Sequence, residues 1–169
     1  MITRLIDRDP ETKFGTFREA LYYDGISESI ALVMGDVAGH EDVLCRIHSA
    51  CVGGHVFNSL ECECAAEMAA SQAMIQAAGR GVIIYLDQEG KGNGHLALLA
   101  SIPHKKAGSS QSEAYEKAGF AADARSFRPA AEIIADLGVR SVVLLTNNAE
   151  KADELRRASI TVSDTRAFS

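Results

Sequence analysis

The chain has 169 residues, of which 47% are hydrophobic and 24% charged, a length and composition typical of one globular domain with a sizeable core. Its formal net charge is −6, from 23 acidic and 17 basic residues, which argues against general electrostatic binding to nucleic acid or to an anionic membrane. The first ten residues do not resemble a signal peptide, and no apolar stretch reaches the ~18 residues of a membrane helix. We therefore expect one cytoplasmic domain over residues 1–169, acting on a small molecule.

Apolar runs and helical patterns alternate along the chain. In chain order they predict strands at 30–33 and 43–47, a helix at 65–78, a strand at 82–86, helices at 112–118 and 129–137, a strand at 142–145, a helix at 149–158 and a final strand. Pro129 suits a first helical turn, and Gly138 suits a helix end. The runs at 82–86 and 142–145 are almost wholly apolar, as in strands buried on both faces. This order predicts an α/β fold with a mixed β-sheet flanked by helices.

The cysteines are clustered in one part of the chain. Cys51, Cys62 and Cys64 follow the spacing C-x10-C-x-C just before a predicted helix, which suits a metal site better than a disulfide framework. Three protein ligands leave one position open on a tetrahedral zinc ion, as in catalytic sites. Cys45 lies in a strand-like run and is interpreted as a core residue. Two alternatives stay open on spacing alone: a closed structural zinc site that includes Cys45, and buried thiols without a metal.

Four blocks of the sequence resemble the GTP cyclohydrolase II family of the riboflavin pathway. The blocks are RIHSACVGGHVFNSLECEC at 46–64, DQEGKGNG at 87–94, GFAADAR at 119–125 and LLTNNAEK at 144–151. They keep the family's order along the chain. The resemblance implies the family's fold, a homodimer, and a Zn²⁺ ion held by Cys51, Cys62 and Cys64. It also implies a hydrolase that attacks C8 of guanine, opens the imidazole ring, releases formate and removes pyrophosphate with the help of Mg²⁺.

The resemblance also implies roles for single residues. Asp123 matches the family's proton acceptor, and Arg125 matches the arginine that acts on the α-phosphate. Positions expected to bind substrate are Arg46, His48, Glu67, Glu89, Gly90, Lys91, Thr146 and Lys151. A carboxylate such as Glu89 can accept hydrogen bonds from N1–H and the amino group of guanine together, which distinguishes guanine from adenine.

Several positions depart from the family's pattern. Ala50, His55 and Glu67 replace the family's Glu, Asp and Gln, so base recognition is expected to differ. Glu61 and Asp87 stand where the family has basic residues, and each is expected to oppose a triphosphate. Ile102 stands at the position of an active-site tyrosine. We predict from this last change that hydrolysis stops at a formamide product.

Three functions follow from these patterns. The first is ring opening of a guanine nucleotide. The second is a zinc amidohydrolase of the same fold acting on another nucleobase or nucleotide, such as a uracil derivative, which the charge reversals and Glu67 favour. The third is a nucleotide-binding protein that keeps zinc as structure, which a fourth thiolate from Cys45 would support.

Overall fold

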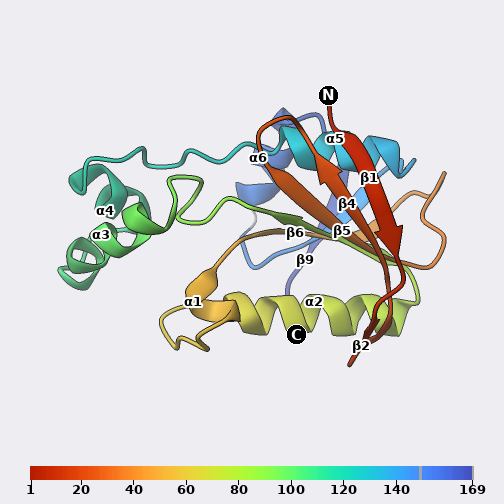
Figure 1. Cartoon of the computed structure of the whole chain (residues 1–169), viewed down its shortest axis with the longest axis horizontal. Coiled ribbons are helices and arrows are strands. Elements are labelled where there is room, and N and C mark those ends of the chain that lie inside the picture. Colours follow the sequence, from red (N-terminus) through yellow and green to blue (C-terminus); the bar gives the residue numbers. More distant parts are fainter. Residues whose placement is uncertain (149, 169) are drawn as a thin grey trace.

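The structure, a computed structural model, describes residues 1–148 and 150–168, and in these ranges seven strands form one mixed sheet (Figure 1). In spatial order the strands are β1 (Thr3–Arg8), β4 (Arg18–Tyr23), β5 (Glu28–Met34), β7 (Gly81–Leu86), β6 (Val43–Ser49), β8 (Val142–Leu145) and β9 (Val162–Arg166). A separate small hairpin joins β2 (Glu11–Thr12) to β3 (Gly15–Thr16).

The sheet has an antiparallel half and a parallel half. The pairs β1–β4, β4–β5 and β5–β7 are antiparallel, whereas β6–β7, β6–β8 and β8–β9 are parallel. Strands β6, β7 and β8 therefore end at the same edge of the sheet. The cysteine block follows β6, the glycine-rich block follows β7, and Thr146 follows β8. Ligands of α/β proteins commonly bind at this edge, outside the carboxyl ends of parallel strands.

Helices cover both faces of the central strands. Helix α2 (Cys64–Ala78) lies along one face, where Ile75 packs against Leu44 and Ile83 (Figure 1). Helices α5 (Arg128–Asp136) and α6 (Glu150–Arg157) cover the other face, where Ile133 and Leu155 join the larger core cluster. Because β7 and β8 lie between these layers, their side chains are buried on both faces, as their apolar runs predict.

A helical hairpin projects from the sheet beyond the glycine-rich block. It consists of α3 (His95–Lys106) and α4 (Gln111–Lys117), which pack against each other and lie away from the sheet (Figure 1). Helix α4 begins with a capping box between Ser110 and Glu113. A further short helix, α1 (Val52–His55), directly follows the first cysteine of the cluster.

The predicted α/β fold with a mixed sheet flanked by helices is confirmed. Each predicted strand and helix exists within about two residues of its expected bounds, except that Ala149, the predicted first residue of the last helix, lies outside the described residues. Pro129 lies in the first turn of α5, and Gly138 follows that helix with a φ of 70°. Helix α3 was not predicted, because glycines precede it and Pro103 lies inside it.

Candidate active site and metal centre

A pocket of about 960 Å³ opens where β6, β7 and β8 end. Its walls come from the cysteine segment, the glycine-rich block, helices α3 and α4, and the start of α6. All thirteen predicted site residues line it: Arg46, His48, Cys51, Cys62, Cys64, Glu67, Glu89, Gly90, Lys91, Asp123, Arg125, Thr146 and Lys151. Segments more than a hundred residues apart in the sequence thus contribute to one cavity, while the roles assigned to single residues stay predictions.

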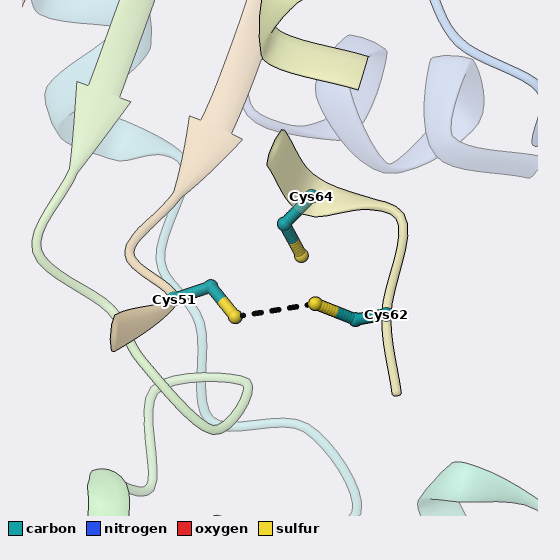
Figure 2. A group of neighbouring side chains, drawn as sticks. All are labelled: Cys51, Cys62 and Cys64. Carbon is teal, nitrogen blue, oxygen red and sulfur yellow. Dashed lines mark hydrogen bonds between the residues drawn. The ribbon is translucent and has the colours of Figure 1, made fainter. Parts of the chain in front are cut away.

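The three cysteines of the cluster point toward one another (Figure 2). The Sγ atoms of Cys51, Cys62 and Cys64 all lie within 4.8 Å of one another, and those of Cys51 and Cys62 are 3.6 Å apart. Cys51 follows β6 and caps α1 through a hydrogen bond from the backbone N–H of Gly54, whereas Cys64 begins α2. A soft, tetrahedral metal such as zinc prefers this donor set.

The backbone next to the thiols leaves room for them only because residue 54 is glycine. A Cβ atom at Gly54 would lie 2.9 Å from the Sγ of Cys62 and 3.4 Å from that of Cys51. The local chain is therefore shaped around the three sulfur atoms. These observations fit a metal ion held by Cys51, Cys62 and Cys64.

The thiols differ in how readily they ionise. Burial opposes ionisation of Cys62, but hydrogen bonds from the backbone and side chain of Cys64 and from Cys51 outweigh it and lower the pKa of Cys62. Burial raises the pKa of Cys64 and of Cys51. Metal binding must therefore displace protons from at least part of the cluster.

Cys45 does not belong to the cluster. It is fully buried in β6 within the larger core, and burial raises the pKa of its thiol to about 12. Among the described residues, the group suited to a metal consists of the other three cysteines. The interpretation of Cys45 as a core residue is confirmed, and the four-thiolate alternative loses its support.

Arg46 begins a buried chain of polar side chains along the pocket floor. Its guanidinium pairs with Glu67, donates to the carbonyl of Leu145 (3.1 Å), and donates from Nε to Nδ1 of His48 (3.3 Å). The Nε2 atoms of His48 and His55 are 3.2 Å apart. Burial first, then the positive charge of Arg46, lowers the pKa of His48 to about 3, so this imidazole is neutral.

This chain fixes the tautomers of both histidines. Since Nδ1 of His48 accepts from Arg46, its proton is on Nε2 and is donated to Nε2 of His55. The proton of His55 is then on Nδ1, a buried atom with no hydrogen-bond partner among the described residues. His55, one of the departures from the family pattern, thus contacts His48 without itself lining the pocket.

Asp123 and Arg125 form an ion pair that faces the pocket. Nε of Arg125 donates to both carboxylate oxygens of Asp123, at 2.9 and 3.1 Å, and its guanidinium also lies 3.8 Å from Glu154. Burial opposes the charge of Asp123, but these hydrogen bonds prevail and lower its pKa. The carboxylate is therefore ionised at neutral pH.

Lys151 adds a second cation, which is half-buried. Its Nζ donates to the carbonyl of Ile47 at 3.0 Å. Burial first, then repulsion from Arg46 and Arg125, lowers the pKa of Lys151 to about 8. A cluster of cations that repel one another at the base of a pocket is a suitable site for an anionic group.

Glu89 already makes contacts within the protein. Its Oε1 atom accepts from the backbone N–H of Val52 at 2.9 Å and lies 3.1 Å from Nδ1 of His95. Glu89 thereby links the glycine-rich block to the start of α1. Both contacts fall on the same oxygen, so a base that needs both oxygens must share or displace them.

The two charge reversals have different surroundings. Glu61 lines the pocket, but Lys106 of α3 lies 3.9 Å from it. Asp87 is exposed and is not among the pocket-lining residues, and its expected effect on a triphosphate stays a prediction. Lys105 lines the same wall as Lys106. The sequence did not predict either lysine as a pocket residue, because it did not predict α3. The only signal for them was a basic pair that follows an apolar stretch.

The fold and the pocket together define an α/β protein with a three-thiol site at the carboxyl ends of parallel strands. Residues 3–167 match the sequence profile of the family described as GTP cyclohydrolase II. The chain belongs to this family, whose members are cyclohydrolases. The resemblance of the four sequence blocks is thus confirmed.

Curated relatives agree with this assignment, and a solved structure shares the fold. The riboflavin biosynthesis protein RibBA of Bacillus mycoides (strain KBAB4) is 40% identical over 166 residues, covering 97% of this chain and 42% of that protein. RibBA of Bacillus subtilis (strain 168) is 40% identical over 170 residues, covering 96% and 43%. The chain thus spans about two fifths of the length of these relatives.

The crystal structure of RibBX, a two-domain 3,4-dihydroxy-2-butanone 4-phosphate synthase from A. baumannii, matches with a TM-score of 0.53 at 18% identity, over 99% of this chain and 40% of that one. This likeness supports the fold alone.

Proposed function

We propose that this protein is a zinc-dependent hydrolase that opens the imidazole ring of a guanine nucleotide, as in the riboflavin pathway. The observation that carries the proposal is the pocket that combines three clustered thiols, the Asp123–Arg125 pair and the half-buried Lys151. Membership in the GTP cyclohydrolase II family supports the choice of guanine and of a nucleotide.

The cysteines and the cations would act at opposite ends of the substrate. Cys51, Cys62 and Cys64 would hold the zinc ion, which when bound supplies Lewis-acid activation of water at neutral pH. Lys151 and Arg125 would bind phosphate oxygens, and Asp123, ionised at neutral pH, would accept a proton at a carboxylate oxygen. Magnesium would accompany the phosphates, because it is usually held through substrate phosphates.

The residues around the base would set specificity. Glu89 would read the guanine edge, Gly90 and Lys91 would border the nucleotide, and Thr146 would contact a phosphate. Arg46, fixed by Glu67 and His48, would present its guanidinium from the pocket floor. Ile102 lines the pocket without a hydroxyl group, which supports a reaction that stops at the formamide.

A second function is favoured by the contacts of Glu89. One oxygen of Glu89 already contacts the backbone N–H of Val52 and the imidazole of His95. The pocket therefore suits a base that offers fewer hydrogen-bond donors than guanine. The alternative is therefore a zinc amidohydrolase of the same fold acting on another nucleobase or nucleotide, such as a uracil derivative. A non-catalytic nucleotide-binding protein is less well supported, since Cys45 does not complete the thiol cluster.

The experiment is a substrate comparison with zinc-loaded protein and magnesium. GTP, GMP, guanosine and uracil nucleotides are incubated separately, and products are identified by ultraviolet absorbance and mass spectrometry. We expect GTP to be consumed. Turnover of a uracil nucleotide in place of GTP would support the second function, and no turnover with any substrate would support a binding protein.

Assembly and location complete the proposal. We propose a homodimer, which light scattering of the purified protein would test against a monomer. A cytoplasmic location suits three thiols that must stay reduced to bind metal. No helix among the described residues is long and apolar enough to cross a membrane.

A further inference from the structure

The segment that carries Asp123 and Arg125 belongs to no helix or strand. Residues 121–127 run between α4 and α5 without regular hydrogen bonding of their own. Within the segment Arg125 donates to Asp123 from its backbone N–H and from Nε, so contacts from elsewhere in the fold must hold the segment as a whole. What fixes this segment therefore also fixes the direction of the Arg125 guanidinium.

The contacts come from the glycine-rich block after β7. Gln88 Nε2 donates to the carbonyl of Ser126 at 2.8 Å, and the backbone N–H of Ser126 donates back to Gln88 Oε1 at 3.1 Å. The side-chain amide of Gln88 thus makes two hydrogen bonds with the backbone of Ser126, one as donor and one as acceptor, as a neighbouring β-strand would. We call the hydrogen bonds between residues 88–93 and 121–126 the clasp.

Two further hydrogen bonds complete the clasp. The backbone N–H of Ala124 donates to the carbonyl of Lys91 at 2.9 Å, and Asn93 Nδ2 donates to the carbonyl of Ala121 at 2.9 Å. Arg125 therefore lies between two residues, Ala124 and Ser126, whose backbones are both held by the glycine-rich block.

The glycine at position 92 permits this approach. A Cβ atom at Gly92 would lie 2.7 Å from the backbone carbon of Ala124, and its φ of 81° is in the left-handed region. At Gly90 a Cβ atom would lie 2.3 Å from the carbonyl oxygen of Gly94. These glycines bring protein backbone close to protein backbone, which gives the block a scaffolding role in addition to any contact with substrate.

We propose that Gln88 is a positioning residue that, through the clasp, directs the Asp123–Arg125 pair into the pocket. This inference rests on the proposed function for its effect on turnover. Removing the amide of Gln88 deletes both hydrogen bonds to Ser126, so the backbone next to Arg125 becomes free to move. A displacement of about 1 Å in a catalytic group can lower a rate ~100-fold.

The test compares Gln88→Ala with Gln76→Ala, which removes the same amide from an exposed position on α2 outside the pocket. We expect Gln88→Ala to lower kcat about 10- to 100-fold with KM changed less than about threefold, and with zinc content and melting temperature equal to the control. Hydrogen–deuterium exchange in residues 119–127 should be faster in Gln88→Ala alone. Equal kcat and equal exchange in the two variants would overturn the proposal.

A second comparison tests whether Gln88 acts through Arg125. In an Arg125→Ala background, Gln88→Ala should cause little further loss of residual kcat, since residues that act as one unit are not additive. If Gln88→Ala lowered kcat in the Arg125→Ala background as much as it does in the unaltered protein, the positioning role would be overturned. If the unaltered protein does not turn over GTP, the proposed function fails, while the exchange measurement still decides the clasp: unchanged exchange at 119–127 contradicts it, and faster exchange supports it.

Discussion

Lys151 donates a hydrogen bond from Nζ to the backbone carbonyl of Ile47, 3.0 Å away, and so joins α6 to the pocket end of β6. Burial and the nearby Arg46 and Arg125 lower its pKa to about 8. The ammonium is thus held close to its titration point. An anionic ligand would stabilise the charged form and raise the pKa again.

The first prediction concerns nucleotide affinity. Affinity for GTP should fall as pH rises through about 8, because the cationic form of Lys151 that binds phosphate is lost. Lys151→Met should weaken binding about 10- to 100-fold at pH 7, the loss of one charged hydrogen bond, and should remove this pH dependence. Isothermal titration at pH 6.5 to 9.5 measures both. An unchanged pH profile in Lys151→Met would exclude Lys151 from the phosphate site.

The second prediction concerns folding stability. The pKa of Lys151 is about 8 in the folded state against 10.5 for an unperturbed lysine, so between these values the unfolded chain binds more protons. The free energy of unfolding should therefore gain a contribution that rises with pH across this window. Urea unfolding of the protein and of Lys151→Met at pH 7.5 and 9.5 isolates the contribution of Lys151 to the free energy of unfolding. The same pH dependence in both proteins would contradict the lowered pKa.

The third prediction concerns the metal centre. Gly54→Ala should lower zinc affinity at least ~10-fold, because a Cβ atom there would lie 2.9 Å from Cys62 Sγ. Gly53→Ala is the matched control, since its Cβ atom would meet Ser59 at an ordinary 3.7 Å. Competition with a chromogenic chelator measures the affinities. Equal zinc affinity in the two variants would show that Gly54 is not needed by the thiol cluster.

The fourth prediction concerns Arg125. Arg125→Ala should lower kcat at least ~100-fold, as expected for a charge that stabilises the transition state. The control is Arg128→Ala, which removes a half-exposed arginine paired with Glu132 at the start of α5. Steady-state kinetics on the two variants decides the point. Activity of Arg125→Ala close to that of the control would remove Arg125 from the mechanism.

The sequence predicted β5, β6, β7, β8, a final strand and most helices because their apolar residues face a continuous core, whereas β1 and β4 were not predicted. Helix α3 was missed for a physical reason: it packs against α4 away from the sheet and leaves Leu96 and Leu99 exposed, so no clear apolar stripe marks it. Lys105 and Lys106, at its end, were missed with it.

The pocket residues were predicted from motifs, but their partners were not. The pairing of Arg46 with Glu67, of Gln88 with Ser126 and of Glu89 with the Val52 backbone depends on how distant segments meet in space. No local pattern encodes such contacts. The position of Asp87 outside the pocket likewise depends on the direction in which the chain leaves β7.

The most direct test of the central claim is carbon-13 NMR of GTP labelled at C8, incubated with magnesium and with the zinc-loaded protein. We predict that the aromatic C8 signal disappears and that a formamide carbon replaces it, with Cys62→Ser as the inactive control. A formate signal would preserve ring opening and refute the formamide product. An intact C8 signal in the presence of stoichiometric zinc would contradict the proposed function.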